Sequence, residues 1–259
     1  MRVAIEAVGV LAPGFPDWGN ARDVLAGRAP FVDAPLAPCA PASLAPSERR
    51  RSSATVRLAL AAAEQAMKQT AIAPQDMALV FASAEAAAVI THQLCEALAG
   101  TREVSPTQFH NSVHNAPSGY YSIAMKAKLG ATSLCRGPWS FAAGLLGAAA
   151  QALGDDVPVL FVCYDSPLPA PLCESLPVIE ATAIAIMISP LPAAATLASW
   201  EIAIETREGA GAWPAWMPQA WHANASARGF DALAMLVAET GASATLPLSP
   251  ELAVRVARC

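Results

Sequence analysis

Charged residues are scarce in this sequence, and their scarcity limits the partners that the protein can have. Only 14% of its 259 residues are Asp, Glu, Lys or Arg, against roughly 25% in typical globular domains. The net charge is −5, the pI is near 5.4 and no basic stripe dominates, so the composition argues against nucleic-acid binding. With so little charge to cover its surface, part of the protein is expected to meet another chain.

Metal-binding and disulfide patterns are missing as well. The six cysteines contain no CxxC pair, and the four histidines show no HExxH or comparable spacing. The sequence therefore indicates neither a zinc site nor a disulfide framework. We expect no metal and no cofactor.

No uninterrupted apolar run reaches the length of a membrane span. The most apolar late stretch, residues 180–200, is broken by Pro190 and Pro192 before the roughly 20 residues that a span needs. The N-terminus lacks the apolar core and small-residue cleavage site of a signal peptide. These absences predict a cytoplasmic protein without a membrane span.

Strand-like and helix-like segments alternate along the chain. Apolar, β-branched segments predict the strands, and apolar residues at three- and four-residue steps predict the helices. The predicted strands lie at 2–12, 76–84 and 157–165, and the predicted helices at 17–27, 54–69 and 87–100. This order predicts an α/β fold with helices layered between sheets.

The rest of the chain predicts a strand pair, two irregular stretches and a final helix and strand. Adjacent antiparallel strands are expected at 180–190 and 196–207, a proline-rich surface loop at 30–47, a tryptophan-rich loop at 211–229, a helix at 230–240 and a short strand at 251–259.

One predicted helix is apolar on every side. Residues 137–153 read GPWSFAAGLLGAAAQAL, a helix-breaking Gly-Pro followed by more than three turns with almost no polar side chain. A helix that is hydrophobic all round belongs in an interior. The segment is therefore predicted to be a buried central helix.

Polar side chains bunch together before this helix. Asn111, His114 and Asn115 are expected in a loop, and a helix is expected to open at Gly119. Such residues often serve only as turns and caps. The alternative is a role in an interface or a site.

The whole chain resembles the β-ketoacyl synthase group of the thiolase fold, in an unusually short form. The matching segments are VAIEAVGVLAPG, SATVRLALAAAEQA, FHNSVHNAPSGYYSIAMKAKLG and SFAAGLLGAAAQAL, in the family's order. The resemblance implies a thiolase-like layered α/β sandwich over residues 1–259 as a single unit. It would consist mostly of the family's N-terminal half, with a shortened second half.

In that family the last segment begins with a cysteine at a helix N-terminus, which lowers the thiol pKa and stabilises the oxyanion formed from a thioester. The alignment puts Phe141 there, between Ser140 and Ala142, and a phenyl ring cannot attack a thioester. Active members also use two histidines and a lysine, whereas this chain has only His222 and no lysine beyond residue 141. The resemblance thus implies no catalytic residue.

Such losses are typical of chain-length-factor-like subunits, which pair with an active ketosynthase and shape the cavity where a polyketide grows. The resemblance implies this role in type II fatty acid or polyketide elongation of the aryl polyene kind. The ketosynthase would be the partner in a heterodimer and acyl carrier protein an indirect partner. The implied interface or tunnel residues are Phe109, His110, Asn111, His114, Asn115 and Tyr120.

Two other functions remain open from sequence. One is an acyltransferase or hydrolase that uses Ser140 or Cys135 as its nucleophile, although a serine at a helix start is more often a cap and a nucleophilic serine needs a positioned base. The other is a module that binds acyl thioesters or acyl carrier protein without chemistry.

Overall fold

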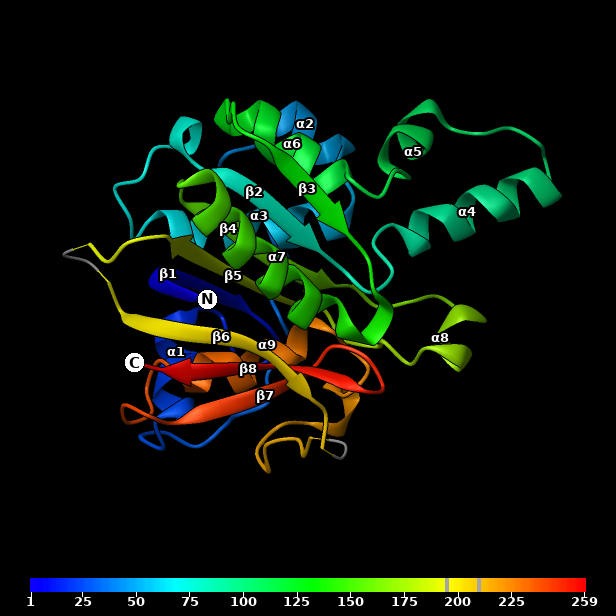
Figure 1. Ribbon diagram of the computed structural model, residues 1–259. Helices are drawn as coiled ribbons and strands as arrows, with labels where there is room; N and C mark the ends of the chain where they lie inside the picture. Colours follow the sequence, from blue (N-terminus) through cyan, green and yellow to red (C-terminus); the bar gives the residue numbers. More distant parts are fainter. Residues whose placement is uncertain (194–195, 209–210) are drawn as a thin grey trace.

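The strands of the protein form one mixed sheet (Figure 1). The structure is a computed structural model and describes residues 1–193, 196–208 and 211–259. The strands are β1 (Arg2–Leu11), β2 (Ala78–Ala82), β3 (Ala131–Leu134), β4 (Val159–Asp165), β5 (Thr182–Ser189), β6 (Ala198–Thr206), β7 (Ser243–Pro247) and β8 (Leu252–Arg258). Across the sheet their order is β3-β2-β4-β5-β1-β6-β8-β7. β2 pairs in parallel with β3 and β4, and the other pairs are antiparallel.

Helices cover both faces of the sheet (Figure 1). They are α1 (Trp18–Leu25), α2 (Pro46–Arg51), α3 (Ala54–Met67), α4 (Ala88–Ala99), α5 (Pro106–Asn111), α6 (Ala116–Met125), α7 (Ser140–Asp155), α8 (Leu172–Ser175) and α9 (Gly229–Ala234). Short 3₁₀ turns lie at Pro74–Asp76, Gly137–Trp139, Gln219–Trp221 and Ser226–Arg228. The proline-rich residues before α2 contain no helix or strand from residue 30 on, as predicted.

The alternation along the strands divides the interior into two cores. In β5, Ile184 and Ile186 point to the side of α7, whereas Ala183 and Ala185 point to the side of α3, because successive strand residues face opposite ways. The predicted layered α/β fold is confirmed. The described residues contain one sheet with helices on both faces, however, where helices between sheets were expected.

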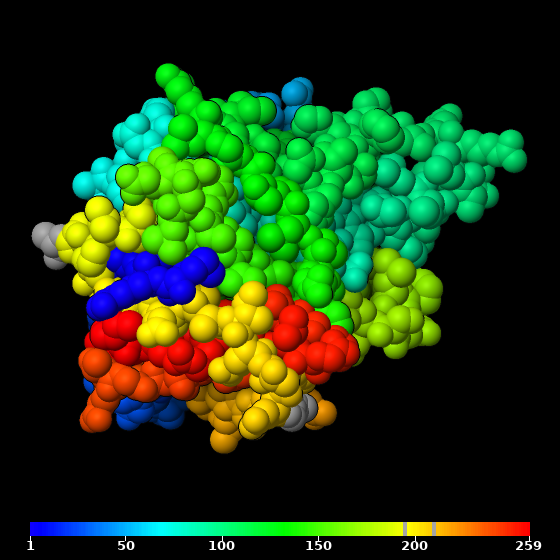
Figure 2. All heavy atoms as spheres, in the orientation of Figure 1, coloured from blue at the N-terminus to red at the C-terminus, as the bar shows by residue number. Residues whose placement is uncertain are grey.

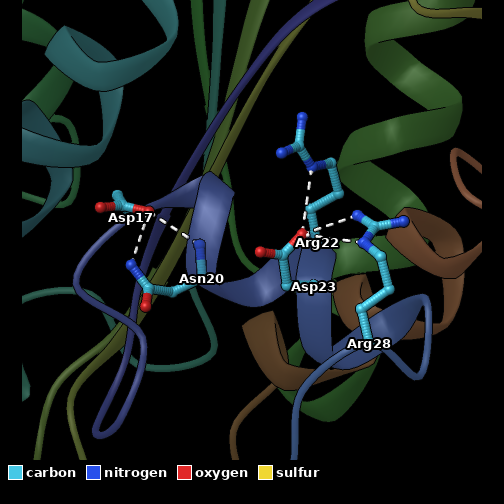
Figure 3. Close-up of polar contacts among 5 residues, drawn as sticks. All are labelled: Asp17, Asn20, Arg22, Asp23 and Arg28. Carbon is cyan, nitrogen blue, oxygen red and sulfur yellow. Dashed lines mark hydrogen bonds and ion pairs between the residues drawn. The ribbon is translucent and has the colours of Figure 1, made fainter.

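Local contacts fix both ends of α1 (Figure 3). The carboxylate of Asp17 accepts hydrogen bonds from the backbone N–H of Asn20 at 2.9 Å and from its side-chain amide at 3.0 Å. Near the other end, Asp23 pairs with Arg28 at 2.7 Å and lies 3.7 Å from Arg22, and the Arg28 hydrogen bond lowers the pKa of the Asp23 carboxyl. The helix predicted at 17–27 thus forms at Trp18–Leu25, with Asp17 as its N-cap.

Gly9 lets α3 approach β1 closely. A methyl group on Gly9 would lie 2.1 Å from the carbonyl oxygen of Ala62 in α3, a separation that backbone atoms cannot tolerate. We expect Gly9→Ala to lower the free energy of unfolding by about 3 kcal/mol through overpacking, measured by urea denaturation. Gly119→Ala is the control, because nothing lies within 4 Å of the added methyl group and alanine is the better helix former. Equal stability of the two variants would contradict the close approach.

The expected pairing of the two late strands is wrong. β5 and β6 both pair with β1, which lies between them. Their alternation correctly identified two strands, but alternation carries no information about a third strand inserted from the N-terminus.

Several other elements differ from the sequence expectation. Asn111, expected in a loop, is the last residue of α5, which Ser105 caps by accepting from the N–H of Gln108. His114 and Asn115 lie in the turn before α6, as expected. The following helix begins at Ala116, before Gly119, with a proline in its first turn, which a helix start tolerates. The helix expected at 230–240 ends at Ala234, and β3 and β7 were not predicted.

Candidate functional site

The N-terminus of α7 lies close to the carboxyl ends of the parallel strands. The Phe141 ring occupies the space at this end of the helix. Phe141 is fully buried, and its ring centroid lies 5.3 Å from that of Phe161 in β4. A methyl group on Gly229 would lie 2.4 Å from the Phe141 ring, so the ring is also closely packed against the start of α9. Phe141 therefore acts as a packing residue at the position where the family resemblance expects a nucleophile.

The Ser140 hydroxyl forms its hydrogen bonds with backbone groups. The oxygen accepts from the N–H of Arg136 at 2.9 Å, and it lies within donating distance of the carbonyls of Gly137, at 2.7 Å, and Ser83, at 3.1 Å. The side chain is fully buried. These contacts are those of a turn-closing serine and give it no side-chain base.

Cys135 and Ala142 border this position without forming a catalytic arrangement. The Cys135 thiol donates to the carbonyl oxygen of Ala84, and the cysteine is exposed. Ala142 is buried in the core. His222, the histidine considered from sequence, instead stacks on Trp213 with ring centroids 4.6 Å apart.

A buried carboxylate at the end of β4 escaped the sequence analysis. Asp165 accepts from the backbone N–H of Ser226 at 2.7 Å, from the Ser226 hydroxyl at 2.6 Å and from the N–H of Ala84 at 3.0 Å. Burial raises the pKa of the Asp165 carboxyl, while the hydrogen bonds that it accepts act in the opposite direction. The sequence signal that could have identified Asp165 was its position as an acidic residue at the end of an apolar strand. Asp165 ties the turn before α9 to the segment that follows β2.

Replacing one acceptor oxygen of the Asp165 carboxyl by an amide NH₂ is expected to destabilise the protein. In Asp165→Asn the new amide NH₂ would face either the N–H of Ala84 or the N–H of Ser226, and two donors cannot bond each other. The expected cost is about 2 kcal/mol at pH 7, measured by urea denaturation, with Asp33→Asn on the exposed loop as the control. A variant as stable as the unmodified protein would contradict the role of the carboxylate.

The same pair of proteins has an expected pH dependence. Because the folded-state pKa of Asp165 lies above its ordinary value of 3.8, folding takes up protons between these two pKa values. The stability that this carboxyl contributes is therefore highest below pH 3.8 and is lost as pH rises through the folded-state pKa. The free-energy difference between the unmodified protein and Asp165→Asn should widen as the pH falls from 7 toward 4.

Most of the implied interface residues meet in one apolar groove, called here the α5–α6 groove. It has a volume of about 860 Å³ and lies between α5, α6 and the chain just before and within α2. Four of the implied residues line it: Phe109, His110, Asn115 and Tyr120. The rings of His110 and Tyr120 meet edge to face at 5.8 Å, and burial raises the pKa of the Tyr120 hydroxyl.

Two of the implied interface residues do not line the α5–α6 groove. Asn111 is buried, and its amide donates to the carbonyls of Arg51, at 3.0 Å, and Thr107, at 2.8 Å, so it joins α5 to the end of α2. His114 lies in a separate shallow hollow beside Glu85 and Thr91. The structure thus places Asn111 and His114 outside the lining of the groove.

The groove also contains apolar side chains that sequence reasoning missed. Val113 and Ile123 line it and are 48% and 83% exposed, and Phe109 is 66% exposed. Leu44 and Glu48 also line it. The sequence signal for them was the presence of apolar residues within and after the segment that contains Asn111, His114 and Asn115. Chemically, the groove suits apolar side chains or a hydrocarbon chain, with few polar groups to orient them.

Two further features beside the groove expose apolar side chains and unpaired strand backbone within the described part of the chain. No residue of α4 is buried, although it carries Val89, Ile90, Leu94 and the 55% exposed Leu98. The helix projects from the body of the protein (Figures 1 and 2). At the sheet edge, β3 pairs with β2 alone among the strands of the described residues. Such surfaces are typical of protein contacts.

The described residues contain neither a metal-binding cluster nor a membrane-spanning helix. Within the described ranges, no group of three His, Cys, Asp or Glu residues could hold a metal ion. None of the helices in the described part of the chain is both long and apolar enough to cross a membrane.

Comparison with known proteins agrees with the fold. The family model of the β-ketoacyl synthase N-terminal domain matches residues 26–244, whereas no curated protein matches the chain. One similar structure is a chain of the ketosynthase ApeO in complex with its chain length factor ApeC from Xenorhabdus doucetiae. Its TM-score is 0.76 at 20% identity, with 100% of both chains covered.

Two other similar structures are longer chains. A β-ketoacyl synthase from Burkholderia phymatum STM815 has a TM-score of 0.62 at 14% identity, with 79% of this chain and 64% of that chain covered. The ishigamide ketosynthase/chain length factor has a TM-score of 0.57 at 14% identity, with 78% and 63% covered. The chain therefore spans just under two thirds of these two structures and shares their thiolase-like architecture.

Proposed function

Because this chain belongs to the β-ketoacyl synthase family, we propose that it is a non-catalytic member that pairs with an active ketosynthase. As a single unit over residues 1–259, it would act as a chain-length-factor-like subunit of type II fatty acid or polyketide elongation. The aryl polyene kind of pathway, a cytoplasmic location and indirect contact with acyl carrier protein are parts of the same proposal.

The observation that carries this proposal is the environment of Phe141. The ring is fully buried against Phe161, so no space is left at the start of α7 for an acyl thioester. Ser140 next to it is bound to backbone groups. Condensation needs a nucleophile at this position that a substrate can reach, and neither residue provides one.

The exposed apolar surface supports pairing with another protein. The α5–α6 groove presents Phe109, Val113 and Ile123, the helix α4 buries none of its residues, and β3 leaves one edge unpaired. These features lie in consecutive parts of the chain, and an apolar surface of this kind favours association. The similar chain from Xenorhabdus doucetiae belongs to a ketosynthase and chain length factor complex, which supports a ketosynthase as the partner.

The deciding experiment is the native mass of the chain after co-expression with the ketosynthases of the same genome. The proposal expects a complex with equal numbers of the two chains. It also expects no covalent labelling of the unmodified chain by an acyl thioester, because the Phe141 ring packs the site. Labelling that maps to Ser140 or Cys135 would instead favour the acyltransferase or hydrolase alternative.

A further inference from the structure

Residues 33–39 of the proline-rich segment, called here the strap, line a second cavity, with a volume of about 550 Å³. The rest of its lining comes from the start of α3, from the chain just after β1 and β4 and from the chain just before β5. Ligand sites in α/β sheets lie beyond the carboxyl ends of the strands, and small-molecule pockets have volumes of this order. Within the described part of the chain, no residue lines both this cavity and the α5–α6 groove.

The strap is anchored on both sides and stiffened between the anchors. The N–H of Gly14 donates to the carbonyl of Ala34 at 2.7 Å. Beyond the strap, the N–H groups of Ala42 and Ser43 donate to the carboxylate of Glu64 in α3 at 3.1 and 2.6 Å. Three of the seven residues 35–41 are prolines, which fix their backbone φ and have no N–H. These anchors and prolines hold the strap in place, so the cavity is formed before a ligand arrives.

Arg57 lines the cavity and has one unused edge on its guanidinium group. Its Nη1 donates to the carbonyls of Ser52, at 2.5 Å, and Arg49, at 3.4 Å, which orients the group at the end of α2. Its Nε and Nη2 donate to no group in the described ranges, and no acidic side chain there pairs with it. Such an edge binds a carboxylate through two parallel hydrogen bonds. Arg57 therefore offers this cavity a position for a carboxylate.

Two carboxylates line the same cavity without partners. The side chains of Asp33 on the strap and Glu180 before β5 form no hydrogen bond or ion pair with any residue that the structure describes. Burial raises the pKa of the Cys39 thiol in the lining, so the thiol adds no charge near pH 7. The lining thus carries charges of both signs, and a ligand with only one charge would leave groups of the opposite kind unpaired.

We propose that this cavity binds a small zwitterion with an apolar side chain, which is the chemistry of a free aliphatic amino acid. The ligand carboxylate pairs with the Nε–Nη2 edge of Arg57, and the ligand ammonium group pairs with Glu180. The ligand side chain packs against Leu36 and Leu58, which lie in the same lining. Exposed Asp33 on the strap adds to the attraction for the ammonium group. Pairing with a ketosynthase is not needed for this binding.

Isothermal titration calorimetry of the chain alone with three matched probes tests the proposal. The probes are L-leucine, leucinamide, which lacks the carboxylate, and isocaproate, which lacks the ammonium group; all three have the same apolar side chain. Leucine should bind at least about tenfold more tightly than either analogue, because only leucine pairs both charges. Absence of saturable leucine binding, or equal affinity for the three probes, would overturn the proposal.

Two variants assign the charges to residues. Arg57→Gln should lower the affinity for leucine to that for leucinamide and leave leucinamide binding unchanged. Glu180→Gln should lower it to that for isocaproate and leave isocaproate binding unchanged. Arg50→Gln, at an exposed position in α2, is the control and should bind leucine normally. Because Arg57 also joins α3 to the end of α2, unchanged leucinamide binding separates lost recognition from a damaged fold. Equal losses for all three probes in either cavity variant would contradict the assignment.

Discussion

Phe141→Ala is expected to lower the free energy of unfolding by about 3–5 kcal/mol. The ring is fully buried between Phe161 on β4 and Gly229 at the start of α9, so its removal leaves a cavity where the two sides of one core meet. Urea denaturation followed by circular dichroism would measure the loss. Because the proposed role of Phe141 is packing, the large effect should fall on stability and not on any chemical step.

Two matched variants make this prediction specific. Phe141→Leu retains most of the buried volume and should cost under about 1.5 kcal/mol. Phe109→Ala removes the same atoms from a side chain that is 66% exposed and should change stability by less than about 0.5 kcal/mol. If Phe141→Ala were no worse than Phe109→Ala, the ring would not be filling the site.

Ile123→Glu is expected to weaken binding to the proposed ketosynthase partner by at least about 100-fold. Ile123 is 83% exposed in the free chain and lies in the lining of the α5–α6 groove. A glutamate there would bring a carboxylate into an apolar contact, where its desolvation is not compensated. Isothermal titration calorimetry with the purified ketosynthase would measure the change.

Ile179→Glu is the control for this prediction. Ile179 is 53% exposed and lies after α8, away from the groove. The substitution has the same chemistry, so both variants should fold normally, and only Ile123→Glu should lose affinity. Equal losses at both positions would show that the effect is one of general surface charge and that the groove is not the contact.

The sequence predicted where most strands and helices lie better than it predicted which strands pair in the sheet. The apolar alternation in residues 180–190 and 196–207 identified both late strands, but it could not show that β1 lies between them. The pairing partner of a strand depends on contacts far along the chain, whereas alternation is local. Short edge strands such as β3 were missed because four residues carry too little pattern.

For the candidate site, too, the sequence identified residues but not their contacts. Resemblance to the family located Phe141, and the structure gives its packing partners. Phe109, His110, Asn115 and Tyr120 line one groove, and their role in an interface or tunnel stays a prediction. Asn111 is one residue from His110, but its amide turns to the carbonyl of Arg51. Which way a polar side chain turns depends on the backbone groups that tertiary folding brings near it.

The central position of β1 has a consequence for how the protein folds during synthesis. β1 is made long before its two neighbours in the sheet, which begin at Thr182 and Ala198. The middle of the sheet therefore cannot close until most of the chain has left the ribosome. Contacts over such separations fold slowly, and the apolar β1 must stay unpaired meanwhile, which favours aggregation. Nascent chains cut before β6 should therefore depend most strongly on chaperones.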